Sequence, residues 1–285
     1  MCGICGKVVA DGAKVEPALV RAMCAALVHR GPDEEGSYSA PGVALGMRRL
    51  AIIDLTPGRI PAQNEDGTVT VVFNGEIYNY RALREELLRR GHRFATETDT
   101  EVLVHLYEDE GERLVERLNG MFAFALWDAR WRRLVLARDR LGEKPLVYWH
   151  APGSLTFASE LGALLCDAAV PRGVDPIALH YYFAFGRVPA PLTIYSGVRK
   201  LPPAHVLIYE RGRVRLWRYW RPSFARKLQL SEDEWCEGIL HHLERSVRLR
   251  LMSDVPLGAF LSGGVDSSAV VAAMARAGAR PVRTF

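Results

Sequence analysis

Short apolar runs separated by turns constrain the fold of this chain more than any other feature. The runs at 122–127, 134–137 and 155–158 have the length of single strands and almost no polar positions. Strands that are apolar on both sides belong to sheets with both faces covered. Helical periodicity at 17–28 and 81–90 supplies elements that can cover such sheets. The pattern therefore predicts an α+β fold with sheets buried between other layers.

Composition excludes several classes of protein. The 285 residues are 49% apolar, which is typical of a globular chain, and the net charge of +4 comes without the dense basic runs of a nucleic-acid-binding protein. We find neither a signal peptide nor an apolar stretch near the roughly 18–20 residues of a membrane span. The five cysteines are odd in number and scattered, which indicates a reducing compartment. We therefore expect a cytoplasmic protein without nucleic-acid or membrane partners.

Cys2 is the first candidate catalytic residue. Removal of Met1 would leave a cysteine whose thiol is a nucleophile and whose free α-amine, with an ordinary pKa of about 7.7–8.0, can act as its base. Alone, this start could equally be a mobile terminus. Cys2 and Cys5 also form a C-x-x-C pair, but no second such pair or spaced histidines support a redox or zinc site. Cys5 is predicted to be a small strand residue.

Several polar residues close to predicted strand and helix ends are candidates for binding a small substrate. Arg48 and Arg49 lie on one strand, so one should point into a pocket as a carboxylate clamp and the other toward solvent. Asn74-Gly75 follows a β-branched strand and is either a turn or a donor pair for an oxyanion. Asp99 lies within Thr98–Glu101, a predicted capping box, so it is either a helix-start residue or a carboxylate for an ammonium group.

A second motif lies near the end of the chain. An apolar strand predicted at 255–261 leads through a glycine- and serine-rich loop into a helix at 269–277. Glycines let backbone N–H groups approach an anion at a helix start, and the loop lacks the Lys-Ser/Thr ending of a Walker A site. The loop suits a pyrophosphate or the phosphates of ATP, with Asp266 available for Mg²⁺. A purely structural turn is the alternative.

The motifs together resemble a glutamine-hydrolysing asparagine synthetase. The amino-terminal part is similar to the class II glutamine amidotransferase domain at MCGI (1–4), HRGPD (29–33), RLAIID (49–54), NGEIYN (74–79), TDTE (98–101), GMFAF (120–124), RDRLG (138–142) and FASE (157–160). The later segments SDVP (253–256) and SGGVDSS (262–268) resemble the opening of the synthetase domain. Stretch 59–62 departs from the family's usual His-Gln-Pro-Met.

The resemblance implies a fold and a mechanism. The fold would be the N-terminal-nucleophile sandwich of four layers, αββα, followed by the first strand, loop and helix of an α/β nucleotide-binding domain. Cys2 would form a glutamyl thioester, and Asn74 and Gly75 would form the oxyanion hole. The glutamine site would comprise Arg49, Leu50, Ala51, Ile52, Ile53, Asn74, Gly75, Glu76 and Asp99. ATP would contact Leu261, Ser262, Gly263, Gly264, Val265, Asp266, Ser267 and Ser268, with Asp266 near magnesium.

We predict a glutaminase domain at 2–212, a linker at 213–230 and the beginning of a synthetase domain at 231–285, whose first helix starts with a capping box of Ser231 and Glu234. Only about 17 residues follow the phosphate loop, whereas a nucleotide-binding domain needs on the order of 100 or more. We therefore expect a fragment with glutaminase activity alone and exposed apolar surface at 257–271. The whole enzyme would make asparagine from aspartate, glutamine and ATP. Another carboxylate acceptor, such as a cell-wall or polysaccharide intermediate, a non-catalytic glutamine-binding role and a homodimer stay open.

Overall fold

The chain divides into two compact units. The computed structural model describes residues 1–56, 58, 60–278 and 281–285. The first unit contains Met1–Ala51 and Thr56–Arg221, and the second contains Ile52–Leu55 and Pro222–Phe285. Arg59, where the stretch 59–62 begins, lies outside the described residues.

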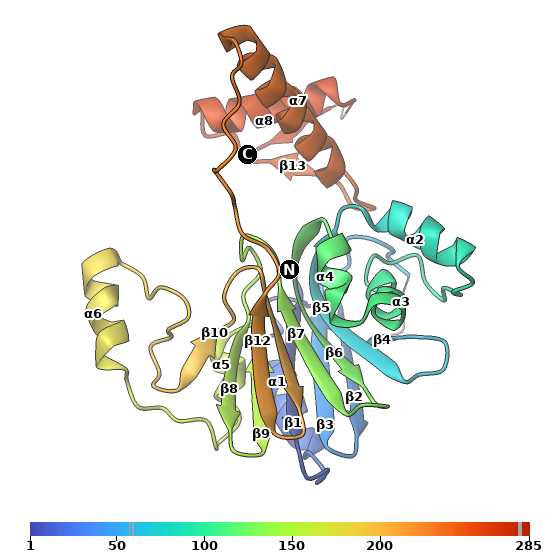
Figure 1. Cartoon of the computed structure of the whole chain (residues 1–285), viewed down its shortest axis with the longest axis vertical. Coiled ribbons are helices and arrows are strands. Elements are labelled where there is room, and N and C mark those ends of the chain that lie inside the picture. The colour runs from blue at the N-terminus through green and yellow to red at the C-terminus, as the bar shows by residue number, and fades with distance from the viewer. Residues whose placement is uncertain (57, 59, 279–280) are drawn as a thin grey trace. The chain divides into compact units, whose positions relative to one another are not determined.

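Two antiparallel sheets form the centre of the first unit (Figure 1). The first sheet has the order β10 (Val198–Lys200), β8 (Val147–Ala151), β9 (Ser154–Ala158), β1 (Gly3–Val9), β3 (Val43–Arg49), β2 (Glu34–Ala40). The second has the order β12 (Arg213–Arg218), β11 (His205–Glu210), β7 (Arg133–Arg138), β6 (Gly120–Asp128), β5 (Val69–Ile77), β4 (Ala62–Gln63). The turns at 64–67 and 210–213 close hairpins.

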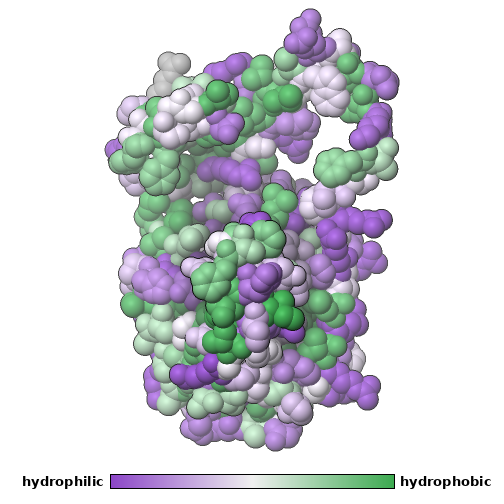
Figure 2. Space-filling model, turned by 90° about the vertical axis from the view of Figure 1, so that its left-hand side faces the viewer, coloured by the Kyte–Doolittle hydropathy of each residue, from purple (hydrophilic) through white to green (hydrophobic). Residues whose placement is uncertain are grey.

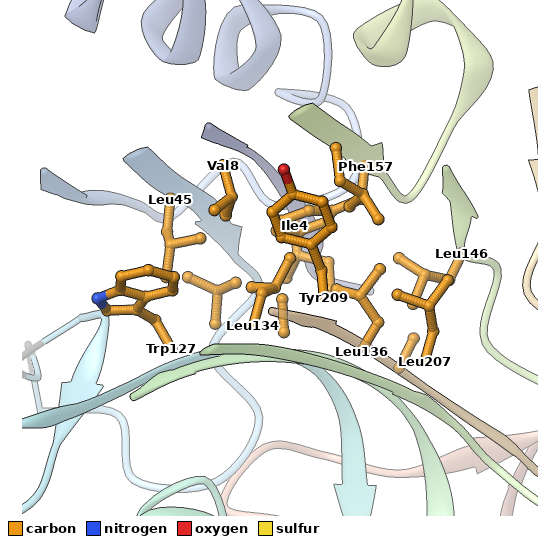
Figure 3. Close-up of a cluster of buried hydrophobic side chains, with 14 of the residues drawn as sticks. Ile4, Val8, Leu45, Trp127, Leu134, Leu136, Leu146, Phe157, Leu207 and Tyr209 are labelled. Atoms are coloured by element: carbon orange, nitrogen blue, oxygen red, sulfur yellow. The ribbon is translucent and has the colours of Figure 1, made fainter. Parts of the chain in front are cut away.

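The hydrophobic core lies between the two sheets. Side chains from β1 and β3 meet side chains from β6, β7 and β11, among them Ile4, Val8, Leu45, Trp127, Leu134, Leu136, Leu207 and Tyr209 (Figure 3). On β6, Ala123, Ala125 and Trp127 face this core, and the alternating residues are buried as well. The apolar runs are therefore strands covered on both faces, as predicted.

Helices form the two outer layers. Helices α1 (Pro17–Ala25) and α5 (Leu161–Leu164) bury Met23, Cys24 and Leu164 in a cluster with Cys5 and Ala44 of the first sheet. Helix α3 (Glu101–Glu110) contacts β4 and β5 of the second sheet and packs with α2 (Tyr80–Arg89), a 3-10 turn (Gly111–Arg113) and α4 (Leu114–Arg117). The order helix, sheet, sheet, helix confirms the predicted αββα sandwich.

Helix α6 (Pro176–Phe185) has an uncovered apolar surface. Asp175 caps its start, and its side chain accepts hydrogen bonds from the N–H groups of Ile177 and Ala178. Ile177, Tyr182, Phe183 and Phe185 are exposed, and the helix lies on the side of the first unit that faces the viewer in Figure 2.

The second unit contains two helices and a short parallel strand pair. Helix α7 (Glu232–Arg250) begins with the predicted capping box, in which Ser231 and Glu234 bond to each other's backbone N–H. Val247 of α7 packs on Ala273 and Met274 of α8 (Val265–Arg276). Among the described residues, the helices include none with the length and apolarity needed to cross a bilayer.

The structure corrects two predictions about this part of the chain and agrees with a third. The strand predicted at 255–261 is only β13 (Gly258–Ala259), because its partner β14 (Arg283–Thr284) offers two residues to pair with. Residues 213–218 are not linker but β12, which pairs along its whole length with β11. The predicted apolar exposure at 257–271 is present, with Phe260 and Val265 the most open of its large side chains.

Candidate active site

Cys2 precedes β1 and is held in place by backbone contacts. The N–H of Leu50 donates to the Cys2 Sγ atom at 3.4 Å, and Arg30 Nε donates to the Cys2 carbonyl at 2.9 Å. Next along the strand, Ile4 N donates to the Ser159 hydroxyl at 3.0 Å. The thiol is therefore at a fixed position, and the alternative of a mobile terminus is wrong.

The local environment leaves the thiol in need of a base. Burial raises the pKa of the Cys2 thiol, an effect that the hydrogen bond from Leu50 opposes. Burial also lowers the pKa of the α-amine that precedes it, and the nearby cations Arg30 and Lys144 act in the same direction. The lowered pKa increases the neutral fraction of an amine at this place, and a neutral amine can accept the proton of the thiol.

The loop at 29–33 closes over the end of β3. Arg30 pairs with Glu160 at 2.7 Å, and the Asp33 carboxylate accepts a hydrogen bond from Ala51 N at 2.9 Å. Gly31 lies so close to β3 that a Cβ atom there would be 2.4 Å from the Arg48 carbonyl oxygen. The loop therefore fixes both the nucleophile strand and the segment from Leu50 to Ala51.

Arg48 and Arg49 point in opposite directions, as expected for neighbours on a strand. Arg49 is buried, pairs with Glu34 at 2.5 Å and acts electrostatically on both Cys2 and Asp99. Arg48, predicted to reach solvent, does not: its side chain is 13% exposed and donates to the Gly31 carbonyl and to Glu35. The loop carbonyl takes the place of water around this guanidinium.

Asn74 and Gly75 lie near the end of β5, not in a turn. Asn74 is fully buried, and neither its side-chain oxygen nor its nitrogen has a hydrogen-bond partner among the described residues. A buried amide without partners is costly unless a ligand supplies them. A Cβ atom at Gly75 would lie 2.2 Å from the Met121 carbonyl oxygen, so only glycine fits this strand pair. The unpaired amide is suited to binding a substrate oxygen.

Asp99 is buried beside the same strand end. Its Oδ2 accepts a hydrogen bond from Ile77 N at 2.8 Å. Burial raises the pKa of Asp99 to about 7; the bond from Ile77 opposes this, Glu76 adds to it, and Arg49 opposes it. A bound ammonium group would stabilise the ionised form of this carboxyl.

The predicted capping box at 98–101 is absent. Helix α3 begins at Glu101 after Thr100, and no side chain caps it. The Glu101 carboxylate instead accepts hydrogen bonds from the N–H groups of Ala95 and Thr96, both at 2.7 Å. The carboxylate predicted to cap the helix thus bonds to the preceding loop instead. Asp99 lies before the helix and is not part of its first turn.

The structure brings most of the predicted glutamine-site residues together in the first unit. Cys2, Arg49 and Asp99 act on one another electrostatically, and Leu50 contacts the thiol. Ile52 and Ile53 belong to the second unit, so their part in this site stays a prediction. The structural roles of Arg30 and Ser159 were missed, although both lie in motifs noted in the sequence. No sequence pattern indicated that Lys144 lies close to the terminal amine.

The predicted phosphate loop has the expected order of strand, loop and helix. Gly264 precedes α8, and Asp266 lies exposed in the first turn. The Ser262 and Ser267 hydroxyls are 3.1 Å apart, and Ser267 Oγ donates to the Gly264 carbonyl. The role of the residues expected to contact ATP stays a prediction. Four of them precede α8 and four form its first turn: Leu261, Ser262, Gly263, Gly264, Val265, Asp266, Ser267 and Ser268.

Comparisons with known proteins agree with both parts of the chain. The glutamine amidotransferase domain family matches residues 1–220, and the asparagine synthase family matches residues 238–285. The chain is 38% identical to asparagine synthetase [glutamine-hydrolyzing] 3 of Bacillus subtilis over 100% of its length, and 40% identical to synthetase 1 of that organism over 89%. It spans only 48% and 40% of those two relatives.

A solved structure supports the fold independently. Glutamine phosphoribosylpyrophosphate amidotransferase from B. subtilis superimposes with a TM-score of 0.54 at 17% identity, covering 100% of this chain and 65% of that one. At this identity the likeness concerns the fold alone. The family match over residues 1–220 shows that the chain belongs to the class II glutamine amidotransferases, and the match over residues 238–285 shows that it continues into the start of an asparagine synthase domain.

Proposed function

We propose that the first unit hydrolyses glutamine to glutamate and ammonia, with Cys2 as the nucleophile. The observation that carries this proposal is the closeness of a partly buried thiol to Arg49, which would clamp a carboxylate, and to Asp99, which would hold an ammonium group. These two charges complement the two ends of a free amino acid. Glu76, which acts electrostatically on Asp99, would assist in binding the ammonium group.

The steps follow from the groups present. After removal of Met1, the Cys2 amine accepts the thiol proton, and the sulfur attacks the side-chain amide carbon of glutamine. Asn74 and Gly75 stabilise the oxyanion, and collapse of the intermediate breaks the C–N bond as the amine returns the proton to the leaving ammonia. Water then adds to the thioester, releasing glutamate and restoring the thiol. Leu50, Ala51, Ile52 and Ile53 would help seat the substrate.

For the whole protein we propose ATP-dependent synthesis of asparagine from aspartate. The asparagine synthase match and the names of the two Bacillus relatives favour aspartate over the other carboxylate acceptors. The segment from Ser262 to Ser268, which comprises the end of the loop and the first turn of α8, would bind the phosphates of ATP. Asp266 is an exposed carboxylate in the first turn, which fits a magnesium ion held mainly by phosphate oxygens and water. A cytoplasmic location and a homodimer remain predictions.

The test is glutamate release from glutamine by the purified chain, measured beside Cys2→Ala and Cys166→Ala. Cys166 is a partly exposed thiol outside the site, so it controls for a general effect of cysteine loss. We expect Cys2→Ala to lose at least about 10³-fold in kcat and Cys166→Ala to match the parent. Equal activity in all three proteins would refute the proposal.

A further inference from the structure

Two histidines and two glutamates form a cluster that glutamine hydrolysis does not use. Glu65 lies in the turn between β4 and β5, His92 follows α2, and His105 and Glu108 lie on α3. One ligand atom from each of the four comes within 4.8 Å of the others, and all four residues belong to the first unit. Segments distant in sequence therefore converge on one point.

The distances between the ligand atoms approach those of a tetrahedral metal site. His105 Nδ1 is 3.3 Å from a Glu65 oxygen and 3.4 Å from a Glu108 oxygen. His92 Nδ1 is 3.5 Å and 3.7 Å from oxygens of the same two carboxylates. Zinc bound at about 2.0–2.1 Å requires ligands about 3.3–3.4 Å apart. Four of the six separations between ligands are within a few tenths of an ångström of that value, and the other two, which are at most 4.8 Å, would shorten when an ion binds.

His92 has the outer partner that metal-bound histidines use, and His105 has a carboxylate just beyond hydrogen-bonding distance. With Nδ1 turned toward the cluster, His92 Nε2 is 3.2 Å from an Asp109 oxygen and His105 Nε2 is 3.6 Å from a Glu101 oxygen. A carboxylate on the far nitrogen fixes the tautomer and strengthens the ligand.

The two glutamates are oriented as well. The Asn64 side-chain amide donates to Glu108 Oε1 at 2.8 Å, and Arg93 N donates to Glu65 Oε1 at 2.8 Å. These bonds leave Oε2 of each carboxylate facing His105. His92 and the two glutamates are thus positioned by bonds from outside the cluster, as in a pre-organised ligand set.

The buried histidine and the carboxylates around the cluster favour the binding of a cation. His105 is fully buried, and its Nε2 has no hydrogen-bond partner among the described residues. Glu101 adds a further carboxylate beside the His105 ring, and Asp109, which also pairs with Arg90 at 2.9 Å, adds one beside the His92 ring. A divalent ion would offset this negative charge and would draw His105 Nε2–H toward Glu101.

We propose that Glu65, His92, His105 and Glu108 bind one Zn²⁺ ion in a structural site. Imidazole and carboxylate ligands suit zinc, and four protein ligands leave no open position for a substrate. Of the four ligands, Glu65 also lines a cleft of about 270 Å³. The ion would tie the β4–β5 turn and the segment after α2 to α3, whose first residue lies two positions after Asp99.

The experiment uses the untagged chain, first stripped with a chelator and then titrated with Zn²⁺ against a competing dye. We expect about one tightly bound ion. His92→Gln and Glu65→Gln should each abolish this binding, and Asp109→Asn, which removes an outer partner, should weaken it about 10–100-fold. Because Glu65 is in an exposed turn, Glu65→Gln keeps the test valid if His92→Gln folds poorly. Circular dichroism checks the fold of each variant.

Two controls separate this site from other zinc ligands in the chain. His241 and His242 are exposed neighbours on α7, and Cys2 offers a thiol beside an amine. The double variant His241→Gln/His242→Gln and Cys2→Ala should both keep the tight site. The Co²⁺ complex should show the visible bands of a tetrahedral ion without the intense near-ultraviolet band of a sulfur ligand.

The thermal transition gives a second readout. Zn²⁺ should raise the Tm of the parent chain and leave that of His92→Gln unchanged. Absence of tight binding by the parent chain, retention of full affinity by both His92→Gln and Glu65→Gln, or loss of the tight site in either control would overturn the proposal and leave the cluster a network of ion pairs.

Discussion

Asp99 is a residue at which stability and substrate binding oppose each other. Burial raises its pKa to about 7 from the ordinary 3.8, the opposite of what a stabilising ion pair does. Its contribution to stability is therefore complete below about pH 4 and is lost as the pH rises through about 7. Glutamine would offset this loss, because its ammonium group favours the ionised carboxyl.

Asp99→Asn should raise stability and impair binding. Asparagine keeps an acceptor for Ile77 N but cannot ionise, so the gain in unfolding free energy should grow from about pH 4 to about pH 7 and then level off at about 1–4 kcal/mol. Tm measured across this range tests it. In the parent, the Tm increase caused by glutamine should be larger at pH 8 than at pH 6, whereas glutamine should not raise the Tm of the variant. A variant that is less stable than the parent at pH 8 would contradict the raised pKa of Asp99.

Arg49→Lys should raise the KM for glutamine. A lysine cannot bind a carboxylate through two parallel N–H groups, so we expect kcat/KM to fall about 10–100-fold, mainly through KM. Arg48→Lys is the matched control, since Arg48 holds the Gly31 carbonyl instead of facing Cys2. Steady-state kinetics distinguish the two; equal effects on KM would show that Arg49 does not bind substrate.

Candidate residues could be picked out from the sequence where a motif contained them. Cys2, Asn74 and Asp99 lie in such motifs, and their chemical roles stay predictions. The environment of Arg48 could not be predicted, because a guanidinium loses its exposure only when a distant loop, here that containing Gly31, folds over it. The need of Cys2 for a base followed from burial, which is a tertiary property.

At the scale of elements, local signals succeeded where no tertiary partner competed. Ser231 and Glu234 cap α7 as predicted, because both partners lie within one exposed turn. At α3 the same pattern failed, since Glu101 bonds to Ala95 and Thr96 instead. The strand predicted at 255–261 failed for a related reason: strand length depends on the partner strand, which is only two residues long.

The pairing of β5 with β6 depends on Gly75. Gly75→Ala would place a Cβ atom 2.2 Å from the Met121 carbonyl oxygen, so we expect a loss of about 2–4 kcal/mol in unfolding free energy and most of the glutaminase activity. Gly162→Ala on α5 is the control, because nothing lies within 4 Å of its added methyl group. Denaturant unfolding measures both; equal stability of the two variants would mean that the strands separate without cost.

At the scale of the molecule, the position of β12 sets the end of the first unit. A chain ending at Arg221 keeps β12 on the edge of the second sheet, whereas one ending at Gly212 exposes β11, whose residues Val206–Tyr209 are buried. We expect 1–221 to unfold cooperatively near the Tm of the longer chain and 1–212 to melt at least about 5 °C lower or aggregate. Identical transitions would place the boundary before β12.

The central claim is that the thiol of a processed Cys2 attacks glutamine. The most direct measurement is mass spectrometry of the amino-terminal peptide after incubation with a diazoketone analogue of glutamine, with and without excess glutamine. The account predicts that Met1 is absent, that one adduct is on Cys2, and that glutamine prevents its formation. An adduct on Cys166 or Cys236 with Cys2 unmodified, or an active protein that retains Met1, would contradict it.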